Sequence, residues 1–170
     1  MLPTQHHNRK MPNSINISFR IADTNQEFAA GASLFQQYAG FIGIDLSFQN
    51  FAEELNTIDK QYMKPKGSLI IAYDGTKAVG CVALRNWDNE TAELKRMFVA
   101  PAYHGHKIGQ RLLEQILGVA QKLGYKKVRL DTISTMEAAL KLYRSFGFYE
   151  IPAYRFNPME ETIYMEKILE

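Results

Sequence analysis

The sequence is short of several residue types and patterns, and each shortage excludes a class of protein. Its 170 residues contain one cysteine, Cys81, so no intramolecular disulfide framework forms. No stretch approaches the roughly 18 uninterrupted apolar residues of a membrane span, and the N-terminal segment lacks the apolar core of a signal peptide. The net charge is only +2, without a block of like charges, which argues against nucleic acid. We therefore expect a cytoplasmic protein with neither membrane nor nucleic-acid partners.

The composition is typical of one globular domain. Hydrophobic residues make up 46% of the chain and charged residues 22%, which is ordinary for a soluble domain with its own core. Residues 1–14 are polar and contain two prolines, so we expect a disordered tail there. No linker or repeat divides residues 15–170, which we expect to form a single domain. Cys81 lies in an apolar run and is interpreted as a small buried side chain rather than a nucleophile.

Hydrophobic periodicity predicts an α/β fold, with a central mixed sheet flanked by helices. Alternating or continuous apolar residues predict strands at 15–21, 69–73, 78–85, 91–99, 127–133 and 162–168. Apolar stripes at helical spacing predict helices near 24–38, 49–59 and 107–124. Ser134 and Glu137 are interpreted as the capping box of a further helix that ends at Phe146. The strand–helix–strand order over 91–133 predicts that its two strands pair in parallel.

The helix predicted at 107–124 begins with positively charged residues, although a helix N-terminus is stabilised by negative charge. A helix N-terminus has partial positive charge and open N–H groups, which favour Asp or Glu. The basic residues His104, His106, Lys107 and Arg111 stand there instead, and the first acid is Glu114. Together with Gly105 and Gly109, they predict a site for a phosphate-bearing anion. The alternative is a plain loop with solvated basic residues.

Two sequence blocks resemble a known family. The first is the turn 104–109 after the strand that ends at Val99, and the second is Leu142-Tyr-Arg-Ser-Phe-Gly-Phe148. Together, at this spacing, they resemble the GNAT superfamily of N-acetyltransferases over residues 15–170, and a block at 93–96 looks like a bacterial small-molecule subgroup. The resemblance implies the GNAT acyl-CoA N-acyltransferase fold. It also implies acetyl transfer from acetyl-CoA to a small-molecule or amino-acid-like amine, or else a sensor module that binds acyl-CoA without catalysis.

The resemblance assigns the coenzyme A site by position. Met97, Phe98 and Val99 would present backbone to the acetyl group and the pantetheine arm. The pyrophosphate would be held by the turn and the first helical residues, which are His104, Gly105, His106, Lys107, Ile108, Gly109, Gln110 and Arg111. His104 and Lys107 depart from the Arg or Gln and the glycine of the family pattern. The His104–His106 pair has no third ligand at suitable spacing, so no metal is expected.

Two residues are candidates for the chemistry of acetyl transfer. Tyr143 occupies the position of the tyrosine that, in the family, donates a proton to the coenzyme A sulfur; its alternative role is a core tyrosine. Glu93 is a candidate base or organiser of a water. Strand alternation places it on the same face as Met97 and Val99 if no bulge intervenes. The alternative for Glu93 is a surface carboxylate paired with Lys95 or Arg96.

Three polar residues are candidates for binding the acceptor. Asp45 lies in the apolar connection 41–48, where a carboxylate could hold an ammonium group or simply cap a helix. Asp131 ends a strand at the edge where open α/β sheets bind ligands, and its alternative is a hydrogen bond to the following turn. Asn157 would complete the pocket from near the C-terminus. Members of the family often dimerise, so a homodimer is a further expectation.

Overall fold

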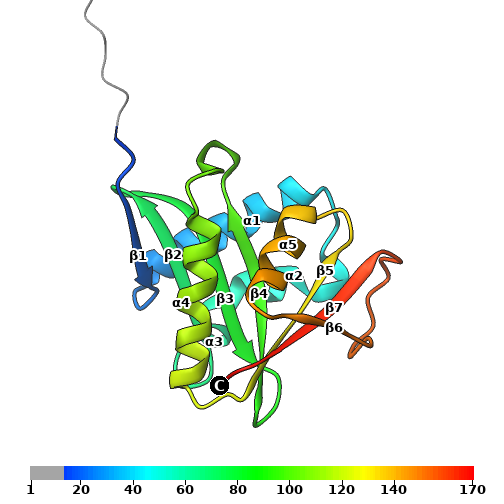
Figure 1. The fold of residues 1–170 in the computed structure, drawn as a ribbon. Helices are drawn as coiled ribbons and strands as arrows, with labels where there is room; N and C mark the ends of the chain where they lie inside the picture. Colours follow the sequence, from blue (N-terminus) through cyan, green and yellow to red (C-terminus); the bar gives the residue numbers. More distant parts are fainter. Residues whose placement is uncertain (1–13) are drawn as a thin grey trace, which may run out of the picture.

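The computed structural model describes residues 14–170; the tail expected at 1–14 lies, apart from Ser14, outside the described residues. Seven strands form one mixed sheet in the order β1-β2-β3-β4-β5-β7-β6 (Figure 1). The strands are β1 (Ile17–Ile21), β2 (Ser68–Asp74), β3 (Lys77–Asn86), β4 (Thr91–Val99), β5 (Lys127–Ile133), β6 (Tyr149–Ile151) and β7 (Thr162–Ile168). The helices are α1 (Asn25–Ile42), α2 (Phe51–Asn56), α3 (Ile58–Gln61), α4 (Ile108–Lys122) and α5 (Glu137–Ser145), with short 3₁₀ turns η1 (Ser47–Gln49) and η2 (Pro101–Tyr103).

The strand pairing confirms the mixed sheet that the element order predicts. Strands β1 to β4 are joined by antiparallel pairings, and β4 then pairs in parallel with β5 across the α4 crossover. The parallel ladder is short, because only residues 91–93 of β4 pair with residues 127–129 of β5. Beyond it the two strands separate, and this opening positions the site.

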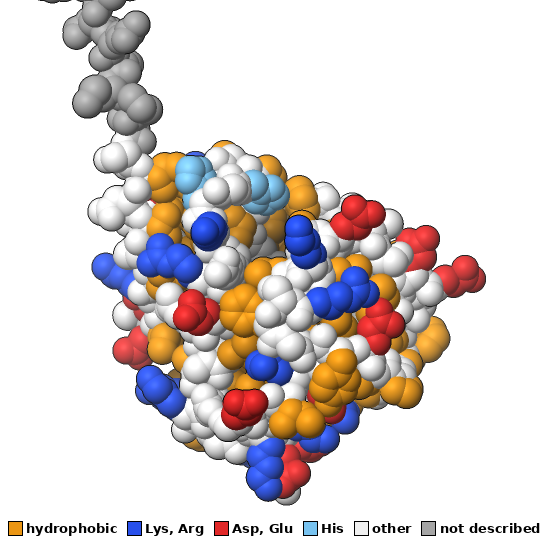
Figure 2. All heavy atoms as spheres, viewed as in Figure 1, with side chains coloured by type: hydrophobic (Ala, Val, Ile, Leu, Met, Phe, Trp, Pro, Cys, Tyr) orange, Lys and Arg blue, Asp and Glu red, His pale blue; other side chains and the backbone are white. Residues whose placement is uncertain are grey.

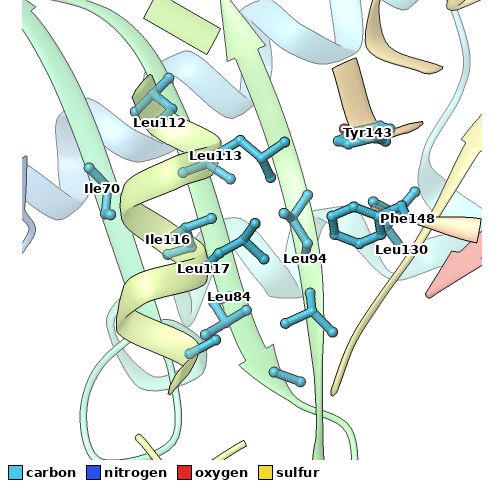
Figure 3. Packing of buried hydrophobic residues seen from close by; sticks show 14 of the residues in the cluster. Ile70, Leu84, Leu94, Leu112, Leu113, Ile116, Leu117, Leu130, Tyr143 and Phe148 are labelled. Carbon is cyan, nitrogen blue, oxygen red and sulfur yellow. The ribbon is translucent and has the colours of Figure 1, made fainter. Parts of the chain in front are cut away.

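Helices cover both faces of the sheet and create two cores. The apolar stripe of α4, including Leu112, Leu113 and Ile116, packs on β2, β3 and β4, and Tyr143 of α5 joins the same core (Figure 3). Helices α1 and α3 pack on the opposite face, where Cys81 is fully buried. None of the helices within residues 14–170 combines the length and the apolarity that a membrane crossing requires.

The helix ends follow from local sequence, with one correction. Thr24 accepts a hydrogen bond from the Glu27 amide while the Glu27 carboxylate accepts from the Thr24 amide, a capping box that starts α1. The capping box predicted at Ser134 is wrong. Helix α5 begins after Met136, and no side-chain cap bonds to its first turn, because residues 133–136 form a turn in which the Met136 amide donates to the Ile133 carbonyl.

Strand β4 contains a bulge that the alternation pattern does not reveal. Cys81 pairs with Phe98 and Ala83 pairs with Lys95, so β4 carries one residue more than β3 between these two pairs. Arg96 takes up the extra length with a left-handed φ of 54°. Since side chains alternate along a strand, an extra residue transfers everything after it to the other face.

Candidate functional site

A cleft of about 550 Å³ lies where β4 and β5 separate. Its walls come from the end of β4, the turn before α4 and the start of α5. The residues of the predicted cofactor site that line it are Met97, Phe98, Val99, His104, Gly105, Lys107, Ile108 and Gly109. Three others, His106, Gln110 and Arg111, do not line it. The Arg111 guanidinium lies 4.4 Å from the centre of the Phe19 ring, on the far side of α4.

The turn before α4 fits an anion with phosphate groups. Lys107 is the residue before the helix and has a left-handed φ of 59°, and no side chain caps the first turn. The N–H groups at the start of α4 are therefore open toward the cleft. A Cβ at Gly105 would meet nothing within 4 Å, and this glycine has a φ of 85°, so the turn leaves open space for a ligand. Figure 2 shows the histidine side chains, with Lys and Arg nearby, beside a hollow at the end where α4 begins.

His104 has a contact that the sequence does not predict. Its Nε2 lies 2.8 Å from the Val99 carbonyl oxygen, and because a carbonyl only accepts, Nε2 donates. The imidazole therefore fixes the turn against the end of β4, and this nitrogen is engaged by the protein. The ring of Phe41 meets His104 edge-on at 6.2 Å between centroids.

Tyr143 lies on α5 and lines the same cleft. Its side chain is 6% exposed and its ring lies 5.7 Å from the ring of Phe148. Burial raises the pKa of the Tyr143 hydroxyl above its usual value, with a smaller contribution from Asp131. The tyrosine is part of the buried core and also lines the cleft, so the two alternatives for this residue do not exclude each other.

A second, smaller cavity of about 60 Å³ adjoins the cleft. Five residues line both spaces, and they mark where the two meet: Tyr38, Arg96, Asp131, Thr132 and Met136. Apolar side chains from the connection after α1, including Ile44, Leu46 and Phe48, form one wall. The cleft and the small cavity thus offer adjacent places for a long ligand and a compact one.

Asp131 lies at the junction with its carboxylate held in place. Arg155 donates to one of its oxygens at 2.8 Å, and Asn157 donates to the other at 3.1 Å. Burial alone would raise the pKa of Asp131, but the charges of Lys95 and Arg155 outweigh it and lower the pKa. The carboxylate is therefore ionised at neutral pH. Both Asp131 and Asn157 line the small cavity, so the structure brings these two predicted acceptor-binding residues together.

Glu93 does not lie at the cleft, contrary to the expectation from strand alternation. The bulge at Arg96 places it on the face opposite to Met97 and Val99. It is fully buried and lines neither cavity. Arg85 Nε donates to one of its oxygens at 2.9 Å, and the Tyr154 hydroxyl donates to the other at 2.8 Å. The alternative of a surface carboxylate paired with Lys95 or Arg96 is wrong as well, because Glu93 is buried and its ion-pair partners are Arg85 and Arg155.

Asp45 also lies outside both cavities. It is exposed, and its carboxylate accepts a hydrogen bond from the Ser47 amide at 2.9 Å. This contact lowers the pKa of Asp45. Asp45 precedes the short turn η1, whose N-cap is Leu46 without a side-chain cap bond, so Asp45 bonds the first residue of the turn without being its cap. Its neighbours Ile44 and Leu46 face the small cavity instead.

Buried charges from β4, Lys95 and Arg96, line the small cavity, whereas the sequence indicated these two residues only as possible partners of Glu93. Arg96 makes a two-pronged ion pair with Glu54 of α2, at 2.7 Å for the shortest contact, and Lys95 lies beside it. The sequence feature that could have indicated these charges is the pair of adjacent cations within a strand that is buried along most of its length. Cys81 Sγ donates to the Arg96 carbonyl, and burial raises the thiol pKa, so Cys81 is a structural side chain. Among residues 14–170, no cluster of His, Cys, Asp and Glu is arranged to hold a metal ion.

Comparison with known proteins identifies the relatives of this fold. The model of the Acetyltransferase (GNAT) family matches residues 12–148. An uncharacterized N-acetyltransferase of Schizosaccharomyces pombe is 37% identical over 153 residues, with 88% of this chain and 93% of the relative covered. The fold is similar to an acetyltransferase of Streptococcus agalactiae (TM-score 0.75, 24% identity, 90% of this chain and 98% of that chain). It is also similar to an N-acetyltransferase of Thermoplasma acidophilum in complex with coenzyme A (TM-score 0.68, 20% identity, 89% of this chain and 99% of that chain).

Proposed function

Because this chain belongs to the acetyltransferase (GNAT) family, whose co-substrate is acetyl-CoA, we propose that it acetylates the amine of a small, amino-acid-like acceptor by direct attack within a ternary complex. The observation that carries the proposal is the meeting of two spaces of different size at Asp131. A long cleft and a compact cavity that share a boundary allow both substrates to be bound at once, which direct transfer requires.

The cleft supports acetyl-CoA along its length. The open N–H groups at the start of α4, with Gly105 and Lys107, would hold the pyrophosphate, because a helix N-terminus favours negative charge. The backbone of Met97, Phe98 and Val99 would run alongside the pantetheine arm and the acetyl group. Of the predicted cofactor contacts, those from His106, Gln110 and Arg111 are the least supported, since these residues do not line the cleft.

The chemistry that we propose uses few groups of the chain. Asp131 would orient the acceptor, whose neutral nitrogen attacks the thioester carbonyl carbon and forms the C–N bond. A backbone N–H near Val99 would stabilise the negative oxygen of the intermediate. As the C–S bond breaks, the Tyr143 hydroxyl gives its proton to the leaving thiolate and recovers one from water. The proton of the nitrogen passes to an ordered water; Glu93 is not given this role, because it is fully buried and lines neither cavity.

Replacement of Tyr143 by phenylalanine tests this assignment. General acid catalysis contributes about 10²- to 10⁴-fold to a rate. We therefore expect Tyr143→Phe to lower turnover by a factor in that range, measured as free thiol released from acetyl-CoA with a panel of small amines, and to leave the affinity for acetyl-CoA nearly unchanged. Tyr149→Phe serves as the control, because Tyr149 does not line the cleft and its hydroxyl bonds to Glu166 instead. An unaltered rate in Tyr143→Phe would remove this residue from the mechanism. Stable acetyl-CoA binding without thiol release for any amine would favour a sensor module.

A further inference from the structure

Lys95 is a buried cation at the floor of the small cavity. Its side chain belongs to a residue that is only 4% exposed, and it lines the small cavity but not the cleft. Within residues 14–170, its Nζ donates one hydrogen bond, to Gln49 Oε1 at 3.2 Å, and it takes part in no ion pair. A buried ammonium group whose only partner is a neutral amide is unusual, since burial of a charge without a counter-ion is costly.

The carboxylates around Lys95 are already paired with guanidinium groups. Glu54 pairs with Arg96 at 2.7 Å, and Asp131 pairs with Arg155 at 2.8 Å. The third carboxylate of this cluster, Glu93, receives both Arg85 at 2.9 Å and Arg155 at 3.3 Å. Three carboxylates therefore face three guanidinium groups, and a protonated Lys95 leaves the cluster with one positive charge in excess.

The surroundings of Lys95 disfavour its protonated form. Burial, together with the charges of Arg96 and Arg155, lowers the pKa of Lys95 to about 7, against the opposing effects of Glu93 and Asp131. An anion that entered the cavity would reverse this balance, because it would pair with the ammonium group and keep it protonated. The cavity is thus prepared for a negative group beside Lys95.

We propose that Lys95 binds a carboxylate of the acceptor, so that the acceptor is an amino acid or a close relative of one, with its amine directed toward Asp131. The proposal rests on the proposed function and names the substrate class for it. Asp131 borders the cleft and Lys95 does not, so this orientation brings the nitrogen to the acetyl group and turns the carboxylate away. The small volume and the apolar wall suit a compact acceptor with an apolar side chain.

A carboxylate suits this site better than a phosphate. The site offers one surplus cation, which matches the single charge of a carboxylate, whereas a phosphate monoester carries about two charges at neutral pH and accepts more hydrogen bonds.

Matched pairs of acceptors test the proposal in the wild-type protein. Each pair consists of an amino acid and the amine that lacks its carboxylate: L-leucine with 3-methylbutylamine, L-phenylalanine with 2-phenylethylamine, and L-methionine with 3-(methylthio)propylamine. A charge-assisted contact corresponds to about 10- to 100-fold in kcat/KM. For the amino acids that the wild type acetylates most efficiently, we expect kcat/KM to exceed that of the matching amine by this factor. Lys95→Met should remove the preference while the amines retain their wild-type rates, and Lys122→Met, an exposed lysine on α4, should change neither.

Several results would overturn the proposal, and they are distinct from a failure of the proposed function. Equal kcat/KM within every pair for the wild type would refute carboxylate recognition and leave acetyl transfer intact. A loss in Lys95→Met that is equal for amino acids and amines would assign Lys95 a catalytic or structural role instead. If no acceptor is acetylated, thermal stabilisation by a ligand still tests the carboxylate site. N-acetyl-L-leucine should raise the melting temperature more than N-acetyl-L-leucinamide in the wild type but not in Lys95→Met. The absence of that difference would refute the anion site by itself.

Discussion

The ion pair between Glu54 and Arg96 fastens α2 to the bulge of β4, and its removal should lower stability strongly. Both side chains are 3% exposed. The Tyr62 hydroxyl also donates to Glu54 at 2.6 Å. In Glu54→Gln the shape is kept, but Arg96 is left as a buried charge without a counter-ion. Loss of one partner of a buried pair costs about 3–5 kcal/mol.

The corresponding change in melting temperature is large enough to measure with certainty. A domain of this size loses about 2–4 °C per kcal/mol, so Glu54→Gln should melt about 6–20 °C below the wild type. Glu53→Gln is a matched control, because Glu53 is the preceding residue in the first turn of α2 and is exposed. The assay is thermal unfolding followed by far-UV circular dichroism, with urea unfolding as a second measure.

A third variant separates pairing from packing. The double change Glu54→Met with Arg96→Met removes both charges and fills the space with apolar atoms, so it should lose less stability than Glu54→Gln. If Glu54→Gln melts together with Glu53→Gln, the ion pair does not hold α2 to the sheet. If the double variant is less stable than Glu54→Gln, the loss comes from packing and hydrogen bonds rather than from the unpaired charge.

Two further predictions concern stability. The urea midpoint of the wild type should rise with pH between the folded pKa of Lys95, about 7, and its ordinary value of 10.5, because the unfolded chain binds the Lys95 proton over that window and the folded chain does not. Lys95→Met should show a smaller rise, and parallel curves for the two proteins would contradict this reasoning. Thr24→Ala removes the hydroxyl of the α1 capping box and should cost about 0.5–2 kcal/mol in urea unfolding. Ser33→Ala, at an exposed position within α1, is its control and should stay within a few tenths of a kcal/mol of the wild type.

Most of the fold follows from patterns local in the sequence. Apolar alternation and helical stripes depend on near neighbours, so the strands at 91–99 and 127–133, their parallel pairing and the helix between them were all predicted within a few residues. The start of α5 was not predicted correctly, because Ser134 and Glu137 have the spacing of a capping box but do not form its hydrogen bonds. The helix predicted at 49–59 is interrupted at Thr57, which ends α2 and precedes α3.

The site was predictable in its cleft and not in its buried charges. The glycine turn and Tyr143 lie within two contiguous blocks, and the structure brings both to one cleft. The surroundings of Lys95 and Glu93 depend on Gln49 and Tyr154, which lie 46 and 61 positions away along the chain and which no local pattern connects to β4. The bulge could not be predicted either, since the alternation pattern assumes that each residue of one strand pairs with one residue of the next.

The extra residue in β4 also has a consequence for how the length of this chain can change. Deletion of one residue between Leu94 and Val99 would let β3 and β4 pair without interruption, and the sheet would survive it. The same deletion would exchange the two faces for part of the strand, so that Lys95 or Met97 would point away from its present surroundings. Insertions and deletions should therefore be tolerated in the exposed hairpin at 87–90 and not in β4, where the number of residues matters as much as their identity.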